Sequence, residues 1–261
     1  MENNYQKHLQ KSLLLLLKEF DILCKKHDIY YSLHGGTLLG AIREKGFILW
    51  DDDVDVTLMR SEYERFKDCL AKENTTLVLR EDIAHCSMLG NQTSGYGLPV
   101  WIDLFIYDYI TENPIGQKLK ILGLTVILGM TKTKAAMKIS RNGEYKGVKY
   151  LAILLFYLFG KLFTMRVKIR FANWFSKKVL TGKKKFIHRS NDQYKALHII
   201  LPVQCMSEYQ CLPFADTMLM VTKNYHNVLI ASYGEDYMIP KQATLSEINA
   251  HDIYRQFWSQ Q

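Results

Sequence analysis

Four aspartates stand within five consecutive positions of this 261-residue chain: Asp51, Asp52, Asp53 and Asp55. Carboxylates this close repel one another, so a folded protein that keeps them together needs a reason to do so. If residues 54–59 form a strand, Asp53 and Asp55 point to the same face, because every second side chain lies on one face. Such paired carboxylates suit Mg²⁺ or Mn²⁺. The spacing therefore indicates a divalent-cation site where the strand begins.

A further acid, Asp103, lies in the otherwise apolar stretch VWIDLFIY at residues 100–107. A carboxylate in a buried strand is costly unless it is paired or bound to a metal. If this strand lies beside the first, Asp103 completes a site of three carboxylates with Asp53 and Asp55. Sites of this kind hold metal ions for phosphoryl or nucleotidyl transfer, and Asp103 could also accept a proton from an attacking hydroxyl.

Upstream of the acids, Gly35, Gly36 and Thr37 lie between a strand expected at residues 29–33 and a helix expected at residues 37–45. Glycines let a ligand approach the backbone closely, and the N-terminus of a helix favours anions. We expect these three residues to bind a donor phosphate. Each feature also has an ordinary explanation: a plain turn, a surface loop or calcium site, and a buried acid paired with arginine. The ordered combination is more specific than its parts.

The periodicity of apolar residues predicts the elements that must position these groups. Helices are expected at residues 5–27, 61–73, 149–163, 164–179 and 225–233, the last ended by Gly234, and strands at 54–59, 77–80, 100–107 and 217–222. Ser61 and Glu64 have the spacing of a capping box, which predicts Ser61 as an N-cap. Strands and helices alternate over the first 110 residues, so the fold class is α/β (α+β), with a mixed sheet and flanking helices.

Charge is distributed unevenly along the chain. Residues 115–190 carry 18 Lys and Arg but one acid, a net charge of +17, whereas the whole chain has +8 and the remainder therefore −9. Such a segment suits an anionic partner: a membrane, a nucleic acid or a phosphate-bearing substrate. Solvated lysines on ordinary helices explain it equally well. Apolar blocks at 119–130 and 150–163 are too short to cross a bilayer but long enough to lie in its interface. We therefore expect peripheral contact with an anionic membrane, rather than nucleic acid.

Composition indicates a folded chain from a reducing compartment. Hydrophobic residues make up 48% of the sequence, and its five cysteines are odd in number and form no CxxC pair. The apolar run at residues 13–17 is short and is followed at once by Lys18 and Glu19, which does not fit a signal peptide. A cytoplasmic location is expected, with attachment to the inner face of the membrane through residues 115–190.

Three stretches carry a resemblance to a known family. The order of a glycine pair, a DxD strand and a later acidic strand resembles the signature of the nucleotidyltransferase fold. More closely, the sequence resembles the LicD family, which includes phosphocholine transferases of bacterial surface glycans and the eukaryotic fukutin-related protein. The matching stretches are GTLLGAIREKGFILWDDDVDVTLMRSEYERF at 36–66, WIDLFIYD at 101–108 and YGEDYMIPK at 233–241.

The resemblance implies roles for individual residues. Asp53 and Asp55 match the family's metal-binding DxD pair, and Asp103 its third acid, while Gly36 and Thr37 fall in its GTLLG turn. Arg43 matches an arginine usual in the family before WDDD and is assigned to a phosphate or to the acid cluster. Asp51 and Asp52 would not bind the metal themselves but would orient the residues that do.

The resemblance also implies the reaction: Mg²⁺- or Mn²⁺-dependent transfer of a phosphorylated alcohol, first of all phosphocholine, from a CDP-activated donor. The acceptor would be a hydroxyl of lipopolysaccharide, teichoic acid or capsule, free or lipid-linked. CDP-glycerol or CDP-ribitol is nearly as good a donor candidate. Two other readings stay open: a nucleotidyltransferase acting on a small molecule or RNA, and a non-catalytic, basic membrane-binding protein whose acids bind Ca²⁺ structurally.

We expect a single LicD-like domain over residues 1–261. Within it, residues 1–114 would form the nucleotidyltransferase-like core, residues 115–190 a basic helical insertion, and residues 191–261 a C-terminal part that packs on the core.

Overall fold

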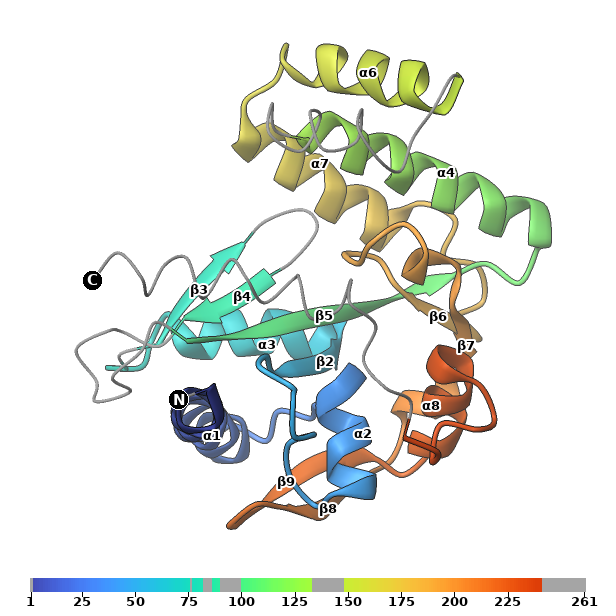
Figure 1. Ribbon diagram of the computed structural model, residues 1–261. Helices are drawn as coiled ribbons and strands as arrows, with labels where there is room; N and C mark the ends of the chain where they lie inside the picture. Colours follow the sequence, from blue (N-terminus) through green and yellow to red (C-terminus); the bar gives the residue numbers. More distant parts are fainter. Residues whose placement is uncertain (1, 76, 82–85, 90–99, 133–147, 241–261) are drawn as a thin grey trace.

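The computed structural model describes residues 2–75, 77–81, 86–89, 100–132 and 148–240 (Figure 1). Part of the basic segment, residues 133–147, and the end of the YGEDYMIPK stretch therefore lie outside the described residues.

A seven-stranded mixed sheet forms the centre of the molecule, in the order β1-β2-β5-β4-β3, with β6 paired to β5 and β7 paired to β6. Parallel pairing joins β2 to β5, whereas the other neighbours run antiparallel. The predicted α/β class with a mixed sheet is confirmed. The strands are β1 (Ser32–Leu33), β2 (Asp55–Met59), β3 (Val78–Glu81), β4 (Cys86–Leu89), β5 (Trp101–Ile110), β6 (Phe186–Arg189) and β7 (Ile200–Pro202).

Two helices pack on the central strands. α1 (Glu2–Lys26) contacts β5, and α3 (Arg60–Leu70) contacts both β2 and β5. α1 does so because its apolar residues recur at helical spacing, which gathers them on one buried stripe. That stripe comprises Leu9, Leu13, Leu16, Leu17 and Phe20, each at most 2% exposed.

Two helix starts differ from the prediction. α2 (Gly35–Arg43) already includes the glycine pair, so Gly35 opens the helix instead of breaking the chain before it. α3 begins at Arg60 with Met59 as its N-cap and no side-chain cap, so the predicted capping box at Ser61 is wrong. The physical reason is that β2 ends at Met59 and the chain turns directly into the helix, which leaves no loop for Ser61 to cap.

A layer of helices follows β5: α4 (Pro114–Thr131), α6 (Val148–Gly160) and α7 (Met165–Lys178). α4 contacts α6 and α7, and α7 also contacts β5 (Figure 1). The Asn113 side chain caps α4 by accepting from the amides of Ile115 and Gly116. Among the described residues, no single helix has the length and hydropathy to cross a membrane; α6 and α7 pass that test only as a pair bent by 114°.

The C-terminal part contributes a hairpin and a helix beside α2. The hairpin consists of β8 (Tyr209–Phe214) and β9 (Thr217–Thr222), and the helix is α8 (Tyr225–Tyr233). β9 and α8 have the predicted bounds, and Gly234 ends α8 with a φ of 91° that favours glycine. α2 contacts both β8 and α8, which places this part next to the start of the DxD strand.

Candidate active site

The two acids that the sequence placed on separate strands are neighbours in the sheet. Asp55 opens β2 and is the direct register partner of Asp103 on the parallel strand β5. Backbone bonds hold this junction: the amide of Asp103 donates to the Val54 carbonyl at 2.8 Å, and the amide of His34 donates to the Asp55 carbonyl at 2.9 Å. Register partners present their side chains on the same face, so both carboxylates lie on one side of the sheet.

The first turn of α2 lies against these acids. A methyl group added at Gly36 would come within 2.9 Å of Asp51 Oδ2, and one added at Gly35 would collide with the Asp55 carboxylate. The side chain of Thr37 binds the same strand, because its Oγ1 accepts from the Asp55 amide at 2.9 Å. The first amides of a helix lack partners within the helix, so this turn can donate to an anion. Gly35, Gly36 and Thr37 are thus beside the acid cluster.

Burial and neighbouring acids raise the pKa of two carboxyl groups in the cluster. Burial, followed by the charges of Asp53 and Asp103, raises the pKa of Asp55 well above its usual value. Burial, followed by Asp53 and Asp52, raises the pKa of Asp51 to about 8. Both shifts mean that the protein does not by itself neutralise the carboxylates gathered here. A bound cation would remove that penalty.

The residues present fit a divalent cation by their chemistry. All the groups are hard oxygen donors, and Asp51 Oδ2 is buried without a hydrogen-bond partner among the described residues. Within that described part, however, no three Asp, Glu, His or Cys side chains converge closely enough to form a ready-made metal site. Binding would therefore require the carboxylates to turn toward a shared point. Asp53 and Asp55 as ligands, with Asp103, remain a prediction.

A buried arginine near this site was missed at the sequence level. Arg189, at the end of β6, is 6% exposed and contacts His34 Nε2 through Nη1. Its Nε lies 3.0 Å from Asp192 Oδ2 in an ion pair. Burial, followed by the charge of Arg189, lowers the pKa of His34 well below its usual value, so His34 is a neutral acceptor. Asp192 is also close enough to contribute to the raised pKa of Asp55.

Arg189 belongs to a run of five polar residues that are all buried. All five residues from 188 to 192 are at most 6% exposed. Asn191 continues the sheet with its side chain, because it accepts from the Ile106 amide at 2.8 Å and donates to the Leu104 carbonyl at 2.9 Å. Five consecutive buried polar residues are unusual and mark a specified network. The polar letters HRSND directly after Phe186 and Ile187 could have suggested it.

Tyr233, the last residue of α8, is a second missed member of the site. Burial, followed by the charges of Asp55 and Asp51, raises the pKa of its hydroxyl. The tyrosine is nevertheless 40% exposed, so it lies at the border between the acid cluster and solvent. Tyr233 opens the stretch YGEDYMIPK, one of the three that resemble the LicD family.

Of the remaining predicted site residues, Arg43 lies away from the acid cluster, whereas Asp52 and Asp53 belong to it. Arg43 ends α2, whereas the acid cluster lies at the start of that helix, and its Nη2 pairs with Glu44 at 3.2 Å. Nine residues of helix separate these ends by about 13 Å along the axis. Asp52 is buried and Asp53 is half-buried. A phosphate-binding role for Arg43 stays a prediction.

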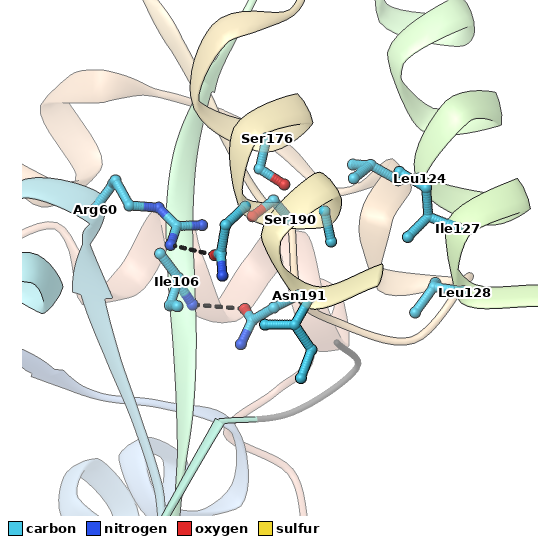
Figure 2. Close-up of a pocket in the computed structure, with 11 residues that line it drawn as sticks. Arg60, Ile106, Leu124, Ile127, Leu128, Ser176, Ser190 and Asn191 are labelled. Atoms are coloured by element: carbon cyan, nitrogen blue, oxygen red, sulfur yellow. Dashed lines mark hydrogen bonds between the residues drawn. The ribbon is translucent and has the colours of Figure 1, made fainter. Parts of the chain in front are cut away.

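A small cavity lies away from the acids, between β5, α4 and α7. It has room for about 20 Å³, close to the size of a single water, so it does not hold a nucleotide. Leu124, Ile127 and Leu128 of α4 line one side (Figure 2). Arg60, Ser190 and Asn191 line the other (Figure 2). Arg60 Nη2 pairs there with Asp108 Oδ2 at 2.6 Å, which makes this network structural.

The region around the acids is similar to a known protein family. Residues 28–95 match the family model described as LicD/FKTN/FKRP, nucleotidyltransferase domain. This stretch contains the first turn of α2 and the four clustered aspartates, whereas Asp103 lies beyond it.

Three curated proteins give partial matches. Lipopolysaccharide cholinephosphotransferase LicD of Haemophilus influenzae is 40% identical over 115 residues, which cover 39% of this chain and 43% of that protein. An uncharacterised protein of Rickettsia typhi is 41% identical over 23% of this chain, and one of Rickettsia prowazekii is 43% identical over 20%; each match covers 19% of the relative. The matches thus span less than half the length of each relative. Residues 28–95 are thus similar to the LicD family, in agreement with the resemblance that the motifs of this stretch carry.

Proposed function

We propose that this protein is a phosphotransferase that moves phosphocholine from CDP-choline to a hydroxyl of a bacterial surface glycan, with lipopolysaccharide the first acceptor to test. The observation that carries the proposal is the pairing of Asp55 with Asp103 beside the first turn of α2. The name of the Haemophilus influenzae relative, a lipopolysaccharide cholinephosphotransferase, supports the choice of substrates.

The acids and the first turn of α2 would have different roles in binding the donor diphosphate. Asp53, Asp55 and Asp103 would hold Mg²⁺ or Mn²⁺, which when bound neutralises phosphate charge and orients the reacting oxygens. The amides of Gly35, Gly36 and Thr37 would donate to the donor phosphates at the positive end of α2. Arg189, held by Asp192 and His34, adds a fixed positive charge near the acids.

The reaction is a displacement at the phosphorus that carries choline. The oxygen of the glycan hydroxyl forms a new bond to this phosphorus, and the bond from the phosphorus to the oxygen shared with the cytidine phosphate breaks. CMP leaves with that oxygen, and the glycan gains a phosphodiester to choline. Asp103 would accept the hydroxyl proton.

The direct test measures CMP release by the purified protein. CDP-choline, CDP-ethanolamine, CDP-glycerol and CDP-ribitol are each supplied with Mg²⁺ and purified lipopolysaccharide, and the glycan is examined by mass spectrometry. The proposal expects CMP release that requires acceptor and adds phosphocholine to the glycan. Preference for CDP-glycerol or CDP-ribitol would keep the chemistry but change the transferred group.

Two results would overturn the proposal. Release of pyrophosphate from a nucleoside triphosphate, with a nucleotide added to a small molecule or RNA, would make the protein a nucleotidyltransferase. No turnover of any nucleotide, with Ca²⁺ binding at the acids and retained binding to vesicles, would make it a non-catalytic membrane protein.

A further inference from the structure

The helix α6 leaves its apolar surface uncovered. No residue from 149 to 159 is buried, although nearly all are apolar. An apolar helix in a folded protein is normally buried in a core or lies against a membrane. Four large residues share one face by helical spacing and are between 48% and 57% exposed: Leu151, Leu155, Leu158 and Phe159.

Exposed apolar residues also occur at the bend after α6 and on α7. Leu162 and Phe163 lie at the bend itself, and Phe171 and Trp174 are exposed and stacked, with ring centroids 5.7 Å apart. Figure 1 shows α6 as the outermost helix of its layer, on the side of α4 and α7 away from the sheet. We call the exposed apolar residues 151–163 together with Phe171 and Trp174 the α6–α7 face.

The charges around the α6–α7 face have one sign. In the described residues 148–185 there are ten Lys and Arg and no acid. Lys161 stands at the bend, and Arg166 and Arg170 follow on α7; all three are exposed and form no ion pair with a described acid. An apolar face flanked in the sequence by cations complements an apolar layer covered by anionic groups. A lipid bilayer with anionic headgroups has that layered chemistry.

We propose that the α6–α7 face attaches the protein to the surface of an anionic membrane, with α6 lying in the interface and the cations at the bend and on α7 contacting headgroups. If the protein transfers phosphocholine to a bacterial glycan as proposed above, this surface is the inner face of the cytoplasmic membrane. Trp174 and the lysines suit this position, since aromatic and basic side chains favour the headgroup level. Attachment does not depend on the proposed transfer reaction, because the acid cluster takes no part in it.

The test is sedimentation of the purified full chain with vesicles, without nucleotide. Vesicles of phosphatidylcholine alone are compared with vesicles that also contain phosphatidylglycerol, at low and high salt. Binding should need the anionic lipid and weaken with salt, because screening reduces the attraction. The double variant Leu162→Ser, Phe163→Ser should reduce vesicle binding at least about tenfold, since it removes apolar contacts with the interface. Arg166→Glu, Arg170→Glu should abolish the preference for anionic lipid.

The matched control is Ile22→Ser on α1, which is 66% exposed but lies outside the α6–α7 face. It should leave vesicle binding unchanged. Each variant should keep wild-type CMP release with soluble acceptor, so loss of attachment is distinguishable from failure of the transfer proposal.

Three results would overturn the inference. The protein could stay in the supernatant with anionic vesicles at low salt, or the bend variant could bind as well as wild type. Alternatively, sedimentation velocity could show a dimer that becomes a monomer in Leu162→Ser, Phe163→Ser. The α6–α7 face would then join two copies of this chain.

Discussion

Asp55 and Asp103 lie side by side on adjacent parallel strands, although 47 residues separate them in the chain. Burial, followed by the charges of Asp53 and Asp103, raises the pKa of Asp55, so the acids form a unit of mutually repelling charges. Such a unit destabilises the metal-free protein and favours binding of a cation, which makes the same acids responsible for both stability and activity.

Replacing either acid should therefore lower turnover but raise the stability of the metal-free protein. Asp55→Asn and Asp103→Asn should each lower turnover on the order of 10³-fold, because metal ligands contribute several kcal/mol to phosphoryl transfer. Without divalent cations, each variant should melt a few degrees higher than wild type, since one repelling charge is gone. CMP release and thermal melting in EDTA measure the two effects.

The control for this prediction is Asp216→Asn, which removes an exposed acid paired with Lys18. It should leave turnover unchanged. Near-normal turnover of Asp55→Asn at saturating Mg²⁺ would remove Asp55 from the site.

Gly35 should be indispensable for the geometry of the acids. It has a φ of +53°, and an added methyl group would collide with the Asp55 carboxylate. Gly35→Ala should therefore lower kcat/KM for the donor by at least about tenfold, through backbone strain and a displaced acid. Gly46→Ala is the matched control, because its methyl group would meet its nearest neighbour at an ordinary 3.6 Å. Equal donor kinetics in the two variants would contradict the prediction.

Local patterns predicted the elements with strong periodicity or clear stops. Residues 217–222 and 225–233 matched β9 and α8, because an apolar run with β-branched residues at its ends and a C-terminal glycine each specify their element locally. β6 and β7 were missed. β6 is a short strand that contains His188 and Arg189. These residue types are usually exposed, but here the surrounding sheet buries both. Only tertiary packing decides such a case.

The acids of the candidate site were predictable, but their surroundings were not. Four aspartates in one short stretch could be identified from the sequence as candidate cation ligands, which stays a prediction. The contact of Arg189 with His34 joins positions 155 residues apart, and no spacing rule connects them. Tyr233 likewise lies near enough to feel the charges of the acids only because α8 packs on α2.

Arg189 should matter more for the donor than Arg43. Its guanidinium is held between Asp192 and His34 near the acids, whereas Arg43 lies at the far end of α2. Arg189→Lys should lower kcat/KM for the CDP donor by roughly tenfold or more, because lysine lacks the planar fork that both partners fix. Arg43→Lys, an identical change at the other arginine, should cost less. Donor kinetics of both variants, with circular dichroism to verify folding, decide between them; the opposite order would restore Arg43 as the phosphate ligand.

His188 should make the protein sensitive to mild acid. It is fully buried on β6, and burial, followed by the charge of Lys120, lowers its pKa to about 4. The unfolded chain takes up a proton near pH 6.5 whereas the folded protein does not, so stability is lost as the pH falls from about 6.5 toward 4.

His188→Asn should be less stable than wild type at pH 7, because it leaves a gap and weakens the contact of Nδ1 with the Leu197 carbonyl, which is 3.2 Å long. It lacks the titrating group, so its deficit should shrink by up to about 3 kcal/mol as the pH falls to 4. Urea unfolding of both proteins between pH 4.5 and 7 measures this difference. Asp108, whose pKa is lowered by Arg60 despite burial, is common to both proteins and cancels in the comparison. Parallel stability curves would show that His188 takes up its proton over the same pH range in the folded and unfolded chains, so that its burial does not govern the acid response.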